Sequence, residues 1–341
     1  MTVLSRINEF FDPCYFRRRL HCNMFRYSIM VIIFLLLTIG EFNSFASEPP
    51  PTARNAGYLL NTFSSKFDDG SVNLSQGHQS GFSWYLWGFF GRQAQANRVV
   101  LNNDGTITLL GDNTGPNGQI ATIAPAKNNA KFVGSAFGGG AYIEAVLKFD
   151  PMDVISSKTK GWPAFWAMSA EHLIEGDQQW LGQQKGYAHF IEVDFFEYDL
   201  VQKGKPLNNY GVNLHDWYGK YKTTCPDMAY CQSSLPFSKV KVRVPGETNF
   251  LAYHSYGFLW LPATPEKKGI GRFYFDGKQI GEDVEWEMFS NQQGIPDAQP
   301  WKFGIIDKQH LVLILGTGPN QPMTVRSVNV WQASDAQNLH Y

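Results

Sequence analysis

Short runs of β-branched and aromatic residues alternate with turn signals along most of this chain, and no long segment carries the period of an amphipathic helix. Asn103-Asp104-Gly105 separates two such runs and is typical of a hairpin turn. Many short strands at this spacing predict an all-β sandwich. The runs that predict strands are 98–101, 106–110, 141–149, 165–168, 190–196, 272–275, 311–315 and 325–331.

The N-terminal pattern differs from the rest and predicts an export signal. Basic residues at 17–19 and at Arg26 precede an apolar run over 29–39, and small residues follow at Ser44 and Ala46. The run is shorter than the roughly 20 residues that a membrane span needs. We therefore expect a signal peptide over residues 1–46 and a secreted or periplasmic protein without stable membrane association after cleavage. Met24 is an alternative start, and an uncleaved signal anchor is the alternative interpretation.

The segment after the signal contains three consecutive prolines, at 49–51. Proline-rich segments favour extended backbone without internal hydrogen bonds. We expect an extended linker over 47–56 and one folded domain over 57–335.

Composition and charge narrow the function classes. Of 341 residues, 17% are charged and 15% are aromatic, which argues against disorder. The net charge of −1 gives no electrostatic footprint for nucleic acid, whereas a neutral polysaccharide suits such a surface. We expect a monomer with no nucleic-acid partner and no cofactor.

Residues 191–198 carry the most informative chemistry in the chain. Glu192 and Asp194 share one face of a strand, because strand side chains alternate with period two. Glu197 would face the other side unless a β-bulge at Phe195 or Phe196 returned it to the face of the other two carboxylates. Like charges resist burial together, so a merely structural strand has little reason to carry them. Paired carboxylates at close spacing are what a retaining glycosidase uses.

Motifs on both sides of this strand strengthen the interpretation. In chain order they are Gly-Trp-Pro-Ala-Phe-Trp at 161–166, the acidic strand, Tyr-His-Ser-Tyr-Gly-Phe-Leu-Trp at 253–260 and Arg-Phe-Tyr-Phe-Asp-Gly-Lys at 272–278. Together they resemble glycoside hydrolase family 16, whose members include laminarinases, lichenases, agarases and carrageenases. The resemblance covers roughly residues 58–332.

The resemblance implies a concanavalin A-like β-jelly roll, two curved antiparallel sheets with a substrate cleft across the concave face. It implies that Glu192 is the nucleophile, that Glu197 is the general acid/base, and that Asp194 holds the charge and orientation of the nucleophile. Glu197 must then be protonated when it meets the glycosidic oxygen, which requires a raised pKa. The resemblance also implies that His254 and Tyr256 belong to the sheet architecture.

Aromatic side chains near the acidic strand are candidate sugar-binding groups. Trp162 and Trp166 share one strand face, and the family resemblance places such tryptophans beside the cleft, although core packing is an alternative for both. Trp180, Trp217 and His215 are further substrate-binding candidates. An exposed loop histidine is the alternative interpretation of His215.

Cysteine usage agrees with export. Cys225 and Cys231 are the pair that remains after signal cleavage, and their spacing favours a disulfide that closes a small loop in an oxidising compartment. Two thiols without further ligands do not make a zinc site. Arg326 stands where many members of the resembled family carry a calcium-binding Asp, so we expect no metal.

The resemblance implies a polysaccharide or oligosaccharide substrate, and it favours an endo-acting hydrolase of β-1,3- or mixed-linked glucan, with galactan as an alternative substrate. A transglycosylase would use the same Glu192 and Glu197 and pass the glycosyl group to another sugar. A non-catalytic glycan-binding module on the same scaffold is the alternative from another class, and such modules typically lose the catalytic carboxylates.

Overall fold

The computed structural model describes residues 48–89, 93–110, 118–127, 131–156, 162–173, 183–198, 207–235, 241–289, 303–316 and 323–341. Residues Glu48–Tyr341 form one compact unit, to which the following description applies. The expected signal peptide at 1–46 lies outside the described residues.

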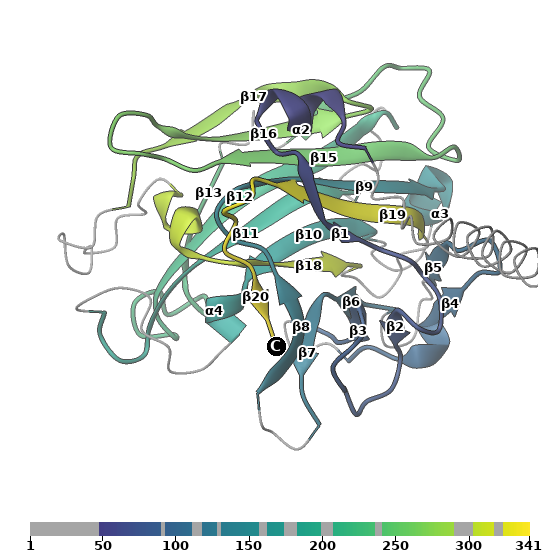
Figure 1. Cartoon of the computed structure of the whole chain (residues 1–341), viewed down its shortest axis with the longest axis horizontal. Coiled ribbons are helices and arrows are strands. Elements are labelled where there is room, and N and C mark those ends of the chain that lie inside the picture. The colour runs from purple at the N-terminus through teal and green to yellow at the C-terminus, as the bar shows by residue number, and fades with distance from the viewer. Residues whose placement is uncertain are drawn as a thin grey trace, which may run out of the picture. The chain divides into compact units, whose positions relative to one another are not determined.

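Two large sheets lie one over the other (Figure 1). The first sheet runs in the order β17 (Lys278–Trp286), β16 (Gly269–Phe275), β15 (His254–Leu261), β9 (Ala141–Phe149), β19 (Met323–Gln332), β5 (Ile107–Leu109) and β4 (Val99–Leu101), and β1 (Leu60–Ser64) pairs with β19. All its pairings are antiparallel within the described residues.

The second sheet runs in the order β13 (Cys231–Ser234), β12 (Asn209–Lys220), β11 (Tyr187–Glu197), β10 (Ala164–Ser169), β18 (Leu311–Leu315), β6 (Ile120–Ala121), β3 (Trp84–Leu86) and β2 (Val72–Asn73). β14 (Lys241–Arg243) pairs with β12. A small third sheet joins β20 (Leu339–His340), β8 (Phe132–Ala136) and β7 (Ile123–Pro125).

Helices are short and peripheral to the strand order. They are α2 (Pro51–Asn55), α3 (Pro151–Ser156), α4 (Ala170–Leu173) and the 3₁₀ segments η1 (Ala96–Arg98) and η4 (Gly304–Lys308). Among the described residues, no helix has the length and apolar character that crossing a membrane would require.

The predicted β-sandwich is confirmed, and every predicted strand run coincides with a strand. The runs 141–149 and 311–315 match β9 and β18 to the residue. The expected hairpin at 103–105 joins the antiparallel pair β4 and β5. Asp276 and Gly277 form the tight turn between β16 and β17, both with positive φ, as a two-residue hairpin requires.

The main core fills the space between the two sheets. Alternate residues of β9, such as Ile143 and Leu147, face Ile191 and Val193 of β11, and all are fully buried. Because β11 alternates, Phe190, Glu192 and Asp194 lie on the opposite face of the second sheet, away from this core. The period of two therefore separates packing residues from chemical residues on one strand.

A β-bulge interrupts this alternation at Phe195 and Phe196, as the sequence predicted. Asp194 pairs with Asn213 and Glu197 with Gly211, so two residues of β11 oppose one residue of β12. Both phenylalanines point into the core, where the Phe195 ring lies 4.7 Å from that of Phe165 and the Phe196 ring 4.5 Å from that of Tyr256. Burying two adjacent rings on one side shifts the alternation and returns Glu197 to the face of Asp194.

Trp260 of β15 and Trp286 of β17 share one partly buried acceptor. Asp307 of η4 accepts the indole N–H of Trp260 at 2.8 Å, that of Trp286 at 2.8 Å and the backbone N–H of Ala263 at 2.9 Å. This carboxylate therefore ties β15 and β17 to η4, the segment that leads into β18. The role expected for the 253–260 motif, sheet architecture, agrees with this arrangement.

The ends of the folded unit differ from expectation. The prediction of an extended linker is wrong for residues 51–55, which form α2 with Pro51 in the first turn. Ala53 is fully buried in a cluster with Tyr58, Tyr142 and Trp331, so apolar contact gives this segment a reason to fold. The folded unit also extends past residue 335, because β20 pairs with β8.

The Cys225–Cys231 disulfide is present and closes the hairpin between β12 and β13, with the two Cα atoms 5.2 Å apart. Lys222 N donates to Ala229 O at 2.9 Å and Met228 N donates to Cys225 O at 3.0 Å inside the same loop. The loop is therefore held by covalent and hydrogen bonds together.

Removing this disulfide should lower stability modestly. Replacing both Cys225 and Cys231 by Ser should cost about 2–3 kcal/mol of unfolding free energy, because a short closed loop loses little chain entropy in the unfolded state. Chemical denaturation of both proteins measures the difference. Quantitative thiol labelling of Cys225 and Cys231 in the native protein would contradict the premise, since a formed disulfide leaves neither thiol free.

Candidate active site

One face of the second sheet gathers the chemistry predicted from the sequence. We call it the carboxylate face: the side of β10 to β13 that points away from the main core and carries Glu192, Asp194 and Glu197. Strand register sets their neighbours, since Glu192 is paired with Met168 and His215, and Asp194 with Trp166 and Asn213. These side chains therefore meet without any loop having to position them.

Each terminal glutamate receives an indole N–H. Trp217 Nε1 donates to Glu192 Oε2 at 2.7 Å, and Trp162 Nε1 donates to Glu197 Oε1 at 2.8 Å. Trp217 comes from β12 and Trp162 from the segment just before β10, so the two glutamates are held from opposite sides of β11. Both tryptophans are partly exposed. Sequence reasoning expected both near the substrate but missed their bonds to the carboxylates.

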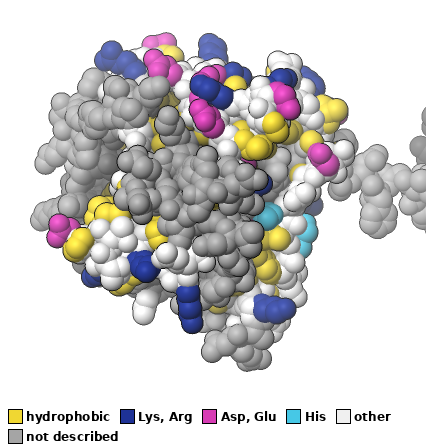
Figure 2. All heavy atoms as spheres, turned by 90° about the vertical axis from the view of Figure 1, so that its left-hand side faces the viewer, with side chains coloured by type: hydrophobic (Ala, Val, Ile, Leu, Met, Phe, Trp, Pro, Cys, Tyr) yellow, Lys and Arg dark blue, Asp and Glu magenta, His cyan; other side chains and the backbone are white. Residues whose placement is uncertain are grey.

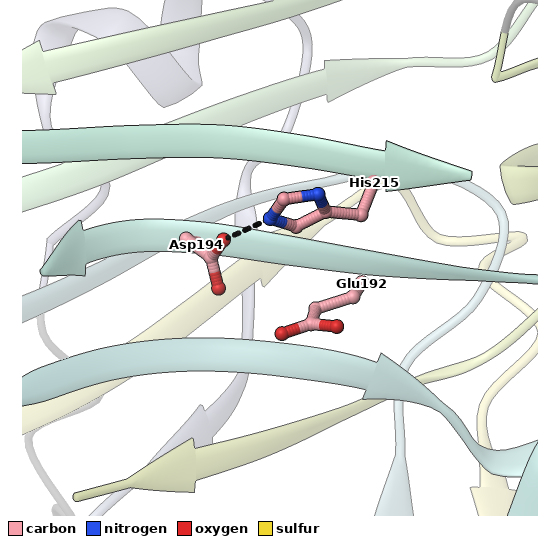
Figure 3. Close-up of side chains that lie close together, drawn as sticks. All are labelled: Glu192, Asp194 and His215. Carbon is pink, nitrogen blue, oxygen red and sulfur yellow. Dashed lines mark ion pairs between the residues drawn. The ribbon is translucent and has the colours of Figure 1, made fainter. Parts of the chain in front are cut away.

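His215 connects the central carboxylate to the sheet edge. Its Nε2 lies 3.1 Å from Asp194 Oδ2, and Glu192 lies beside this pair (Figure 3). On the other side of the ring, Nδ1 lies 2.6 Å from Ser234 Oγ and 2.9 Å from Gln232 Nε2. An amide nitrogen only donates, so Nδ1 accepts and the proton sits on Nε2, which donates to Asp194.

The carboxyl groups of Glu192 and Asp194 hold protons more tightly than exposed carboxyl groups do. Burial raises the pKa of Glu192, and repulsion from Asp194 and Glu197 raises it further, while His215 and the Trp217 N–H oppose the shift. Burial likewise raises the pKa of Asp194, against a hydrogen bond with Glu197 that lowers it. The Glu192 side chain is partly exposed, but its carboxyl lies among these groups and not in open water. The cluster therefore retains protons at a pH where exposed carboxyls are ionised.

The remaining predicted tryptophans have different environments. Trp166 lies on the carboxylate face but is only 2% exposed, and its Nε1 donates to Gly316 O at 3.0 Å. It packs against Phe89 and forms part of the floor, so its ring does not offer a stacking surface in this structure. Trp180 lies outside the described residues.

Gln309 supports the strand directly before Glu192. The pairing of β10 with β11 ends at Met168 and Glu192. Beyond that point, the side-chain amide of the buried Gln309 replaces the backbone of β10 as hydrogen-bond partner of β11. Gln309 Oε1 accepts from Ile191 N at 3.0 Å, and Gln309 Nε2 donates to His189 O at 2.7 Å. Sequence analysis missed this residue, because nothing local distinguishes a glutamine that bridges a distant backbone from one that is exposed.

The donor set favours protons over a metal ion. Glu192, Asp194 and His215 place ligand atoms within 4.8 Å of one another, a spacing that could surround a cation. Here, however, the Trp217 and His215 N–H groups already donate to the two carboxylates. A cation bound by all three residues would have to displace the His215 proton.

The face of the unit drawn in Figure 2 carries both signs of charge. In the view of Figure 2, the described Lys and Arg side chains are interspersed with Asp and Glu, and neither sign dominates that face. A cavity of about 220 Å³ lies elsewhere, lined by Thr108, Lys148, Asp150 and Thr324 among others, and it contains none of the predicted site residues.

Comparison with known proteins gives similarity at the level of structure. No family model matches the sequence, and no curated protein matches it either. The chain is similar to the endo-1,3-beta-glucanase from Streptomyces sioyaensis, with 18% identity, 86% of this chain and 100% of that chain covered, and a TM-score of 0.48. It is similar to beta-agarase A from Zobellia galactanivorans (15% identity, 82% and 91% covered, TM-score 0.46) and to the laminarinase from Rhodothermus marinus (15%, 80% and 96%, 0.40).

The raised carboxyl pKa values predict a pH dependence of stability. Glu192 and Asp194 bind protons more tightly in the folded chain than in the unfolded one, where carboxyl pKa values are about 4. Unfolding therefore releases protons, and the unfolding free energy falls as the pH rises above about 4 towards the folded pKa values. The Glu192→Gln variant has no titrating group at this position, so it does not share this part of the pH-dependent loss. Its unfolding free energy relative to that of wild type should therefore rise from about pH 5 to about pH 8. Urea denaturation at several pH values tests this, and parallel pH profiles would contradict it.

Gln309 should act locally. Gln309→Met removes the acceptor of the Ile191 N–H, so amide exchange at Ile191 should accelerate by about tenfold or more, for an unmet buried hydrogen bond of about 1–3 kcal/mol. Gln332→Met is the matched control, since Gln332 is also buried and donates to Gly138 O and Gly140 O. Equal acceleration at Ile191 in both variants would show only a global loss of stability.

Proposed function

We propose that this protein is a retaining, endo-acting glycoside hydrolase that cleaves β-linked polysaccharide, with Glu192 as nucleophile and Glu197 as general acid/base. The observation that carries the proposal is the β-bulge at Phe195 and Phe196, which brings Glu197 onto the same face as Glu192 and Asp194. A structural strand gains nothing from collecting one buried and two partly buried carboxyl groups.

Glycosylation is the first step. The protonated Glu197 gives its proton to the glycosidic oxygen while the Glu192 carboxylate attacks the anomeric carbon. The bond between that carbon and the leaving oxygen breaks, and a covalent glycosyl-enzyme remains. Trp217 holds Glu192 Oε2, which leaves the other carboxylate oxygen for the anomeric carbon.

Deglycosylation reverses the proton movement. Glu197, now ionised, takes a proton from water as the water oxygen attacks the anomeric carbon and displaces Glu192. The product keeps the starting anomeric configuration, because both steps invert it. The Trp162 N–H stabilises the ionised form of Glu197 during this half of the cycle.

Asp194 sets which carboxyl carries the charge. Burial is the largest cause of the raised Glu192 pKa, and repulsion from Asp194 is the next. A proton on Asp194 removes this repulsion and so favours the ionised form of Glu192. The His215 N–H and Glu197 both bond to Asp194. Asp194 is thus a positioning residue that connects the protonation of Glu197 to the charge on Glu192.

A neutral β-glucan is the favoured substrate, with galactan as the alternative. The support is the sequence motif at 161–166, together with the absence of a single-sign patch among the described residues in Figure 2. The disulfide suits the secreted or periplasmic location expected from the N-terminal segment.

Conservative amide variants test the catalytic roles. Glu192→Gln should reduce turnover to background, and Glu197→Gln should lower kcat by about 10²–10⁴-fold. Both should melt within a few degrees of wild type, because the amide keeps the shape of the carboxyl. Glu144→Gln is the matched control: Glu144 is a partly buried glutamate with a raised pKa, bonded by Tyr142 Oη at 2.9 Å, on the first sheet.

The assay is reducing-sugar release from laminarin, lichenan, xyloglucan, agarose and carrageenan, with anomeric configuration followed by NMR. Activity that survives Glu144→Gln, vanishes in Glu192→Gln and retains configuration supports the proposal. Products of inverted configuration, or full activity in Glu192→Gln, would overturn the mechanism. Longer products without net release of reducing ends would indicate transglycosylation by the same residues.

A further inference from the structure

The hairpin between β12 and β13 presents aromatic side chains to solvent. Tyr221 is 59% exposed, and Tyr230 at the other side of the hairpin is partly exposed. Tyr221 and Tyr230 lie 5.9 Å apart at 72° between ring planes. The Tyr221 ring is therefore accessible to a ligand.

The hairpin is built to hold these rings in place. The Cys225–Cys231 disulfide and the bond from Lys222 N to Ala229 O close the tip. At its base Gly219 has a φ of +104°, and Thr224 Oγ1 accepts from Lys220 N at 2.9 Å. A rigid loop loses less conformational freedom when it binds a ligand.

A row of ring contacts leads from this hairpin to the proposed nucleophile; it passes through Phe190, which is only 2% exposed and which contacts the partly exposed rings of Tyr230 and Trp217. Tyr230 lies 5.6 Å from Phe190 in edge-to-face geometry, and Phe190 is parallel to Trp217, with ring centroids 6.1 Å apart and 11° between planes. Trp217 in turn donates its N–H to Glu192. All of these residues adjoin the carboxylate face.

His172 of α4 completes the row on its far side. Its ring stacks on Phe190 at 3.5 Å and 13°, and meets the Tyr230 ring at 5.6 Å. Burial lowers the pKa of His172 to about 4, so the imidazole is neutral at neutral pH. The His172 imidazole therefore adds no charge to the row, and the Lys222 ammonium lies 5.5 Å from the centroid of the Tyr221 ring at its outer end.

Glycans match this surface chemically. A pyranose ring has an apolar face of C–H groups rimmed by hydroxyls, and aromatic rings with polar tips contact both parts. Continuity with Glu192 means that a chain bound at the scissile bond and running along this row reaches Tyr221.

We propose that the hairpin at 221–230 forms a distal binding site for a neutral β-linked glycan chain, extending the carboxylate face beyond Glu192 and selecting long substrates over short ones. The inference rests on the proposed function for its substrate class, and it assigns the disulfide a role in binding as well as in stability.

Kinetics on long and short substrates test the site. Tyr221→Ala should lower kcat/KM on polymer about tenfold, mainly through KM, and leave the hydrolysis of a trisaccharide unchanged. Tyr221→Phe should keep polymer activity, because the ring remains. Leu251→Ala is the control, since Leu251 is similarly exposed (58%) but lies outside the row. Equal loss on both substrates, or no loss on polymer, would overturn the site.

Binding measurements separate this inference from the proposed activity. Affinity electrophoresis of the Glu192→Gln protein in polymer gels should show retardation that is lost on adding Tyr221→Ala. Retardation that persists without Tyr221 rejects the distal site while the hydrolase proposal stands. An inactive wild-type protein whose retardation depends on Tyr221 rejects the hydrolase and keeps the site. Absence of retardation in every polymer gel rejects the site.

Discussion

Three carboxyl groups, those of Glu192, Asp194 and Glu197, lie on one face of β11, and the positions of the surrounding hydrogen-bond donors follow from this arrangement. Burial and mutual repulsion both favour their neutral forms, so charge persists there only with donors aimed at it. Those donors are Trp162, Trp217 and His215, and they come from chain segments on both sides of β11. The site therefore exists only when the second sheet is assembled in register. A slip of β12 by one residue would turn His215 and Trp217 to the core face.

The bulge connects this site to the hydrophobic core. Phe195 and Phe196 are both buried between the sheets, and their packing against Phe165 and Tyr256 fixes where β11 gains its extra residue. Core packing thus decides that Glu197 joins the other carboxyls. Gln309 acts at the other end of the same strand, where it replaces the hydrogen bonds that β10 no longer supplies. Strand β11 is held on both sides of Glu192 by contacts that are themselves buried.

Aromatic residues serve several purposes in this molecule. Trp260 and Trp286 donate to the partly buried Asp307 and connect β15 and β17 to η4. Trp162 and Trp217 use the same indole N–H to bond the carboxyl groups of Glu197 and Glu192, while their rings remain partly exposed. Tyr221 and Tyr230 place two further rings on a disulfide-closed hairpin. One residue class therefore supplies packing, hydrogen bonds to carboxyl groups and exposed rings.

The sequence by itself determined the strands, the sandwich, the bulge and the Cys225–Cys231 pair, because period-two alternation, turn residues and short-range spacing are local properties. It also located Glu192, Asp194, Glu197 and their neighbours His215 and Trp217. Only the tertiary structure decided that Trp166 is buried, that Pro51–Asn55 folds as a helix, and that Gln309 bridges β11. Each of these features depends on contacts between residues that are far apart in the sequence, and the local sequence pattern does not predict such contacts.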